Sequence, residues 1–235
     1  MIFYERHKVA YVPIPKVACS ALKLALHEME HGVPFARDPD RPRRKTLHQL
    51  YPSARFDPAE ARRLDGYFSF VVVRDPVERI LSAYANKLRQ GEIMKRTRSK
   101  TLFGLFRADL PTEPTPEEFI DRFEHYRAAN TIIRSHTEPT AYFTGPDLGL
   151  YSAVFPLNDR QGLRRGLRKW TGKPPVRIPR RNPTDATHKI TARDLSRRSL
   201  ARLIDLMAPD YALLKDFFEP PALGDVPVTR SVAAD

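Results

Sequence analysis

Cysteine and long apolar runs are scarce in this sequence. Cys19 is the only cysteine among 235 residues, so an intramolecular disulfide is impossible and a disulfide-stapled extracellular fold is excluded. No apolar run approaches the roughly 20 residues that cross a bilayer, and the first residues carry charges where a secretory signal is apolar. The sequence therefore predicts a soluble protein without an integral membrane segment.

Positive charge is plentiful. The 40 Lys and Arg residues outnumber the 28 Asp and Glu residues and give a net charge of +12. Such a charge favours phosphates, sulfates, acidic sugars or nucleic acid as partners and does not choose among them. Two Pro- and Arg-rich stretches, residues 32–46 and 173–189, predict exposed loops. The first loop, residues 32–46, either borders a groove that admits the acceptor molecule of a group-transfer reaction or is a mobile insertion.

The patterning predicts an α/β fold. An apolar strand begins at Val9, and a turn carrying Lys16 leads into a helix that opens near Ser20. Tyr67 to Val73 is β-branched and aromatic almost without alternation, as in a strand buried on both faces of a parallel sheet. We expect a P-loop-like parallel sheet flanked by helices, in a single domain over residues 1–218, with a flexible tail at 219–235.

An Asp or Thr cap followed by Pro predicts the starts of three helices, at Asp57, Asp75 and Thr115. Further along, the pattern extends the third helix over residues 121–129, then predicts a strand at 153–156 and a helix at 159–170 capped at Asn158. Residues 191–218 are helical in pattern, with a bend expected at Pro209.

The turn Pro15 to Ser20 combines the end of a strand, a lysine, small residues and a hydroxyl. It is not a Walker A loop, and a plain strand-to-helix turn with an exposed lysine is the alternative. A second anion site is expected where Arg74 follows the buried strand and Ser82 lies about two turns into the next helix. A Mg²⁺-dependent kinase places an acid at such a strand end to hold the metal. Here Arg74 occupies that position, and Asp75 after it is already explained as a helix cap. The pattern therefore predicts two anion sites without a metal.

These residues resemble a known family. P-K-V-A-C-S at 15–20 and F-V-V-V-R-D-P-V-E-R-I-L-S-A-Y-A-N-K at 70–87 are similar to the two cofactor motifs of the family 2 sulfotransferases, which include many carbohydrate sulfotransferases. Residues 134–139 and 207–211 resemble later segments of the family more loosely. Without extra cysteines or an anchor, the chain is most similar to a soluble, bacterial-type member. This resemblance implies a cytoplasmic location and leaves a peripheral association with the inner membrane open.

The resemblance implies transfer of a sulfuryl group from 3′-phosphoadenosine 5′-phosphosulfate (PAPS) to an acceptor hydroxyl or amine. Lys16 and the turn would hold the 5′-phosphosulfate, and Lys16 would stabilise the leaving phosphate. Arg74 and Ser82 would hold the 3′-phosphate. The implied cofactor-binding residues are Pro15, Lys16, Val17, Ala18, Cys19, Ser20, Arg74 and Ser82.

The acceptor proton needs a base, and a histidine near its ordinary pKa of about 6.5 suits that role. His48 is the first choice, because it follows the long loop and lies roughly where some relatives carry their catalytic histidine; His136 is the second. A surface or capping role is the alternative for His48. The resemblance also makes residues 182–189 a candidate segment for closing over the cofactor.

Two other functions stay open on the sequence. A P-loop-like kinase or phosphotransferase shares the strand, turn, lysine and helix, and predicts Mg²⁺-dependent ATP binding. A basic nucleic-acid-binding module is supported by the charge, but no helix-turn-helix, zinc or RNA-binding signature accompanies it. The basic loops favour a glycan or glycolipid acceptor, and small-molecule and peptide acceptors stay open. The sequence does not predict an oligomeric state.

Overall fold

The computed structural model describes residues 1–40, 42, 45–88, 94, 110–173, 178 and 190–225. Several predicted features lie wholly or partly outside these residues: the closing segment 182–189, parts of the loops 32–46 and 173–189, and the end of the tail. The chain divides into two compact units, Met1–Arg74 with Pro139–Pro183 and Asp75–Glu138 with Thr184–Asp235. The single domain over residues 1–218 stays a prediction.

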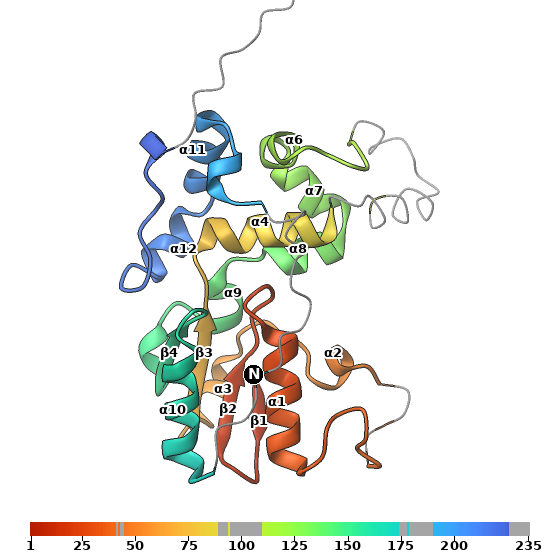
Figure 1. Ribbon diagram of the computed structural model, residues 1–235, viewed down its shortest axis with the longest axis vertical. Coiled ribbons are helices and arrows are strands. Elements are labelled where there is room, and N and C mark those ends of the chain that lie inside the picture. Colours follow the sequence, from red (N-terminus) through yellow and green to blue (C-terminus); the bar gives the residue numbers. More distant parts are fainter. Residues whose placement is uncertain are drawn as a thin grey trace, which may run out of the picture. The chain divides into compact units, whose positions relative to one another are not determined.

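The first unit contains a four-stranded sheet in the order β1-β2-β3-β4 (Figure 1). Its strands are β1 (Ile2–Tyr4), β2 (Val9–Val12), β3 (Phe68–Val73) and β4 (Ala153–Pro156). Strands β2, β3 and β4 are parallel, with Val12 opposite Val71 and Val71 opposite Val154. The sheet confirms the α/β prediction and three predicted strands. The antiparallel strand β1 was missed, because its three residues precede a charged hairpin turn.

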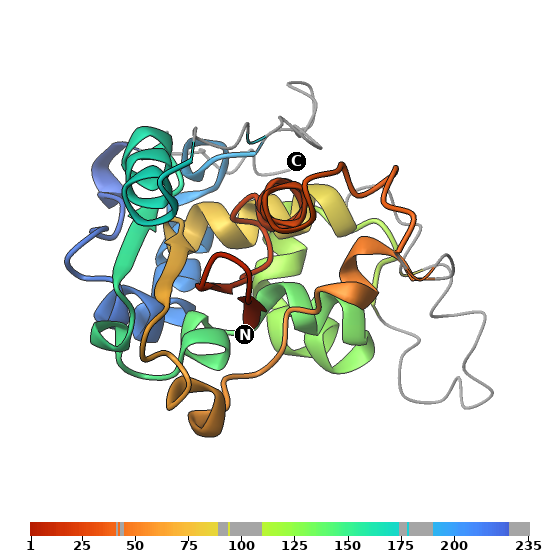
Figure 2. The same cartoon turned by 90° about the horizontal axis from the view of Figure 1, so that it is seen from below.

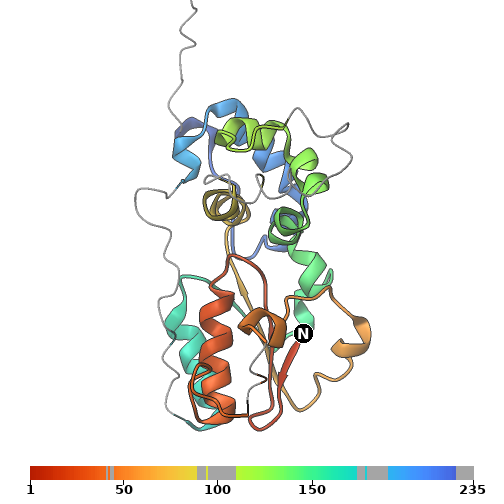
Figure 3. The same ribbon diagram turned by 90° about the vertical axis from the view of Figure 1, so that its right-hand side faces the viewer.

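Helices cover both faces of this sheet. Helices α1 (Cys19–His31) and α10 (Arg160–Thr171) lie on one face, and α3 (Pro58–Ala61) lies on the other (Figures 2 and 3). The unit also contains α2 (Leu47–Leu50) beside α1, α9 (Thr140–Thr144) and a 3-10 helix at Leu148–Leu150. Gly166 lets α10 approach β3 closely, since a Cβ there would lie 3.1 Å from the ring of Phe68.

The second unit is helical. Among the described residues its elements are α4 (Pro76–Lys87), α6 (Pro116–Asp121), α7 (Phe123–Ala129), α8 (Thr131–Thr137), α11 (Arg197–Leu206), α12 (Ala208–Leu213) and 3-10 helices at Ala192–Asp194 and Leu223–Asp225. Their apolar faces form one buried cluster that includes Ile80, Leu81, Phe119, Tyr126 and Leu203. Burial of these side chains stabilises the unit.

The three predicted helix starts are confirmed. Asp57, Asp75 and Thr115 each accept a hydrogen bond from a backbone N–H of the first turn, and proline begins each helix. Two helix extents were predicted too long. The chain leaves the helix at Arg122 between α6 and α7 and at Met207 between α11 and α12, two residues before Pro209. The cap of α10 is Asp159, one residue later than predicted.

Among the described residues, none of the helices has both the length and the apolar composition that crossing a bilayer requires.

Candidate active site

The turn between β2 and α1 takes an unusual backbone path. Lys16 and Ala18 have left-handed φ angles of 70° and 62°, a conformation that costs an L-residue with a Cβ roughly 1–2 kcal/mol. Val17 between them is fully buried and fixes the turn to the core, whereas Ala18 is exposed and Lys16 is half-buried. The structure thus holds Lys16 at a defined place directly before α1.

The start of α1 carries no capping side chain. Its N-cap residue is Ala18, which offers no side-chain acceptor, and the first turn contains no acidic residue. The N–H groups of a first helical turn have no partner within the helix, and the helix dipole makes that end positive. The turn therefore presents backbone donors and a lysine together, as an anion site requires.

Arg74 reaches the same turn. It follows the last residue of β3, and β2 and β3 are parallel neighbours, so their carboxyl ends lie at one edge of the sheet. The Arg74 Nη1 donates to the carbonyl oxygen of Lys16 at 3.4 Å. This hydrogen bond links the turn of the first motif to the strand end of the second motif, within the first unit.

His48, the predicted base, also lies at this turn. It sits in the four-residue helix α2, whose start is fixed by a capping box between Thr46 and Gln49. Its Nε2 lies 3.1 Å from the hydroxyl oxygen of Ser20, the last residue of the predicted cofactor turn. The sequence singled out these two residues for separate reasons, and the fold places them in hydrogen-bonding contact.

The other two predicted residues belong to the second unit. Ser82 is half-buried on α4, and His136 lies in the last turn of α8 with its Nδ1 2.8 Å from the carbonyl oxygen of Ile132. Shared binding of one anion by Arg74 and Ser82, and the role of His136, stay predictions.

Comparison with known proteins settles the family. A family model described as "Sulfotransferase family" matches residues 1–216. The chain belongs to the sulfotransferase family. It is 29% identical over 184 residues to carbohydrate sulfotransferase 14 of Mus musculus and of Homo sapiens, which is 75% of this chain and 48% of each relative.

A shorter match is 31% identical over 98 residues to carbohydrate sulfotransferase 11 of Rattus norvegicus, covering 38% of this chain and 26% of the relative. The sulfotransferase chain thus spans about half the length of the curated relatives that it matches most extensively. No solved structure matches it. These matches confirm the resemblance seen in the two motifs.

Lys23 was missed by the sequence reasoning. It lies one helical turn after Ser20, and its side chain is fully buried. Its Nζ lies 3.4 Å from His48 Nδ1 and 3.3 Å from the Ser53 hydroxyl. Burial lowers its pKa, and the nearby Cys19 opposes that shift. The available signal was a lysine at position i+3 from Ser20, on the same side of the helix.

The contact between Lys23 and His48 links two protonation states. A charged Nζ can only donate to Nδ1, which leaves the proton of neutral His48 on Nε2. A neutral Nζ can accept from Nδ1–H and leaves the Nε2 lone pair facing Ser20. Burial lowers the pKa of Lys23, and the protonation state of its Nζ selects the tautomer of neutral His48.

The second motif also has a structural role in the sulfotransferase. Asp75 caps α4 and accepts a hydrogen bond from the Tyr211 hydroxyl at 3.0 Å. Arg79, only 1% exposed, pairs with buried Asp210 at 3.0 Å and donates to the Glu138 carbonyl at 2.8 Å. Burial and the neighbouring Asp75 raise the pKa of Tyr211. The weaker resemblance at 207–211 thus contains residues that anchor the helix of the stronger motif.

Proposed function

We propose that this chain transfers a sulfuryl group from PAPS to a hydroxyl or amine of a carbohydrate acceptor. The observation that carries the proposal is the placement of His48 against Ser20, at the turn that also holds Lys16 and receives Arg74. Membership of the sulfotransferase family supports the reaction class. A turn used only as a connection has no need of a lysine, an arginine and a histidine from three separate segments.

Lys16 and the first N–H groups of α1 are proposed to hold the 5′-phosphosulfate. During transfer the bond between sulfur and the bridging oxygen breaks, a bond between sulfur and the acceptor oxygen or nitrogen forms, and adenosine 3′,5′-bisphosphate leaves. Lys16 stabilises the negative charge that grows on the leaving phosphate. His48 accepts the proton of the attacking hydroxyl or amine through Nε2.

Arg74 and Ser82 are proposed to bind the 3′-phosphate, with no metal ion in the donor site. The acceptor class is inferred from the names of the relatives, which are carbohydrate sulfotransferases, and from the basic composition. A glycan or a glycolipid carries the hydroxyl groups that the reaction needs. The proposal includes a cytoplasmic enzyme, in keeping with a single cysteine.

Transfer of labelled sulfate tests this function. The chain is incubated with PAPS labelled in its sulfuryl group and with a panel of glycans and glycolipids, without added Mg²⁺. We expect label to move to a carbohydrate acceptor in proportion to enzyme concentration. Label transfer from γ-labelled ATP in the presence of Mg²⁺, with none from PAPS, would instead establish a kinase.

Replacing His48 with alanine is expected to lower kcat by about 10²–10⁴-fold, the usual contribution of a general base. The affinity for adenosine 3′,5′-bisphosphate should stay within about twofold, because His48 is exposed and acts on the acceptor in this proposal. Steady-state kinetics and calorimetry measure the two quantities. His136→Ala is the matched comparison, and a loss of kcat in that variant alone would assign the base to His136.

Replacing Lys23 with methionine is expected to change how stability depends on pH. The pKa of Lys23 is lowered in the folded state from its ordinary value of 10.5, so between these two values the unfolded chain binds more protons. Wild-type stability therefore rises with pH across that window relative to the variant. Urea denaturation at several pH values measures the difference, with exposed Lys169→Met as control. Parallel pH profiles for wild type and Lys23→Met would contradict the lowered pKa.

A further inference from the structure

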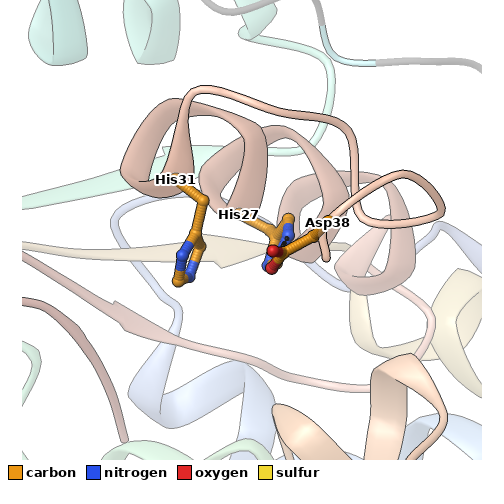
Figure 4. Close-up of side chains that lie close together, drawn as sticks. All are labelled: His27, His31 and Asp38. Atoms are coloured by element: carbon orange, nitrogen blue, oxygen red, sulfur yellow. Dashed lines mark ion pairs between the residues drawn. The ribbon is translucent and has the colours of Figure 1, made fainter. Parts of the chain in front are cut away.

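The far end of α1 carries a second group of polar side chains. His27, His31 and Asp38 offer ligand atoms that all lie within 4.8 Å of one another (Figure 4). Along α1, His27 lies seven positions and His31 eleven positions after Ser20, or about 10–16 Å along the axis. The group is therefore distinct from the proposed donor site.

The two histidines have the spacing of a metal-binding helix. His27 and His31 are four residues apart, so their side chains leave the same side of α1, and their rings stack at 4.4 Å. The pattern H-x-x-x-H places two imidazoles within reach of one ion. Gly32 then ends the helix with a φ of 76°, and the chain turns back to bring Asp38 to His27.

The distance between His27 and Asp38 suits a shared ion. His27 Nε2 lies 3.2 Å from Asp38 Oδ2. Two ligand atoms about 2.0–2.1 Å from one tetrahedral zinc ion are roughly 3.3 Å apart. His31 is exposed, so its imidazole can turn to complete a set of two nitrogens and one oxygen.

His27 is held as a metal-ligating histidine is usually held. Its Nδ1 lies 2.8 Å from the Tyr51 hydroxyl, and its ring packs edge to face with the buried Phe35 ring, with 5.1 Å between the ring centroids. A hydrogen bond at one ring nitrogen fixes the orientation of the ring and the tautomer that ligates through the other. The other ring nitrogen of His27, Nε2, faces Asp38.

We propose that His27, His31 and Asp38 bind one divalent transition-metal ion, with Zn²⁺ as the best fit to two imidazoles and a carboxylate. The ion ties the end of α1 to the segment that carries Asp38. Through Tyr51, which follows α2, it also braces the segment that carries His48. The remaining coordination position is left to water.

Binding of Zn²⁺ alone tests the proposal and needs no assay of activity. The full chain is purified without a polyhistidine tag, stripped with a chelator, and titrated with Zn²⁺ against a chromogenic competitor. We expect one tight site per chain in the wild type and a Tm that rises with Zn²⁺. His31→Gln and Asp38→Asn, which spare the fully buried His27, should each lower the affinity for Zn²⁺ by more than about 100-fold. Loss of a residue that only supports a ligand lowers the affinity by at most about 100-fold.

His125→Gln is the matched control, because His125 is an exposed helical histidine in the other unit. It should bind Zn²⁺ as the wild type does. Tyr51→Phe, which keeps the ring and removes the hydroxyl, should weaken binding by about 10–100-fold. No stoichiometric Zn²⁺ binding in the wild type, or unchanged affinity in both His31→Gln and Asp38→Asn, would overturn the site and leave His27 and Asp38 as an ion pair only.

Discussion

Replacing Lys16 with alanine is expected to remove most binding of adenosine 3′,5′-bisphosphate and to lower turnover by at least about 10²–10³-fold. A charge-assisted hydrogen bond contributes roughly 1.5–3 kcal/mol to binding. Removing one donor to the negative charge that develops in the transition state lowers kcat by about 10²–10³-fold. The fold should survive, because Lys16 is half-buried and alanine accepts the same backbone conformation at a similar cost to lysine. Calorimetric titration and steady-state kinetics measure the two effects.

The chain offers a close control for this experiment. Lys8 is a second lysine in the left-handed conformation, with a φ of 49°, in the turn between β1 and β2. Lys8→Ala changes the same side chain on the same kind of backbone, away from the proposed donor site, and should leave both quantities unchanged. Lys16→Arg keeps the charge and should retain measurable nucleotide binding. Wild-type affinity in Lys16→Ala would remove Lys16 from the donor site.

Replacing Asp210 with alanine is expected to lower the free energy of unfolding by roughly 3–5 kcal/mol. The Arg79 guanidinium is 1% exposed and pairs with Asp210 at 3.0 Å, so the variant leaves a positive charge buried without its carboxylate. The two residues come from distant parts of the sequence and hold α4 to α12 within the second unit. Urea denaturation followed by circular dichroism measures the loss.

An exposed ion pair in the same unit provides the control. Asp121 and Arg202 lie 3.7 Å apart with side chains about half exposed. Asp121→Ala should therefore cost no more than about 1 kcal/mol. The double variant Arg79→Met with Asp210→Leu should recover much of the loss, because an apolar pair of similar size needs no charge partner. Equal losses for Asp210→Ala and Asp121→Ala would contradict the role given to the buried pair.

The parts of the fold that could be predicted are those that depend on residues close together in the sequence. Strand β3 is buried on both faces and therefore reads as an unbroken apolar run, and each Asp-Pro or Thr-Pro pair marks a helix start through its own cap. The breaks at Arg122 and Met207 lie within patterns that are helical on both sides. Their positions depend on packing inside the second unit, which periodicity does not record.

The candidate site was predictable only in part, for the same reason. Lys16 and Arg74 stand out because each follows a strand, and parallel strands bring such positions to one edge of the sheet. Lys23 is surrounded in sequence by the apolar residues of α1 and was passed over, since its partners His48 and Ser53 are 25 and 30 residues away. Asp38 lies in an irregular loop, and only the fold shows that it returns to His27.

Calorimetry with adenosine 3′,5′-bisphosphate, set against adenosine 5′-monophosphate, tests the proposed donor site most directly. Both nucleotides carry the 5′-phosphate, and only the first carries the 3′-phosphate assigned to Arg74 and Ser82. Without Mg²⁺, we expect saturable binding of the first to one site and binding of the second weaker by at least about 10-fold, the loss of one charge-assisted contact. Equal affinity for the two nucleotides, or binding only of ATP with Mg²⁺, would contradict a donor site built for PAPS.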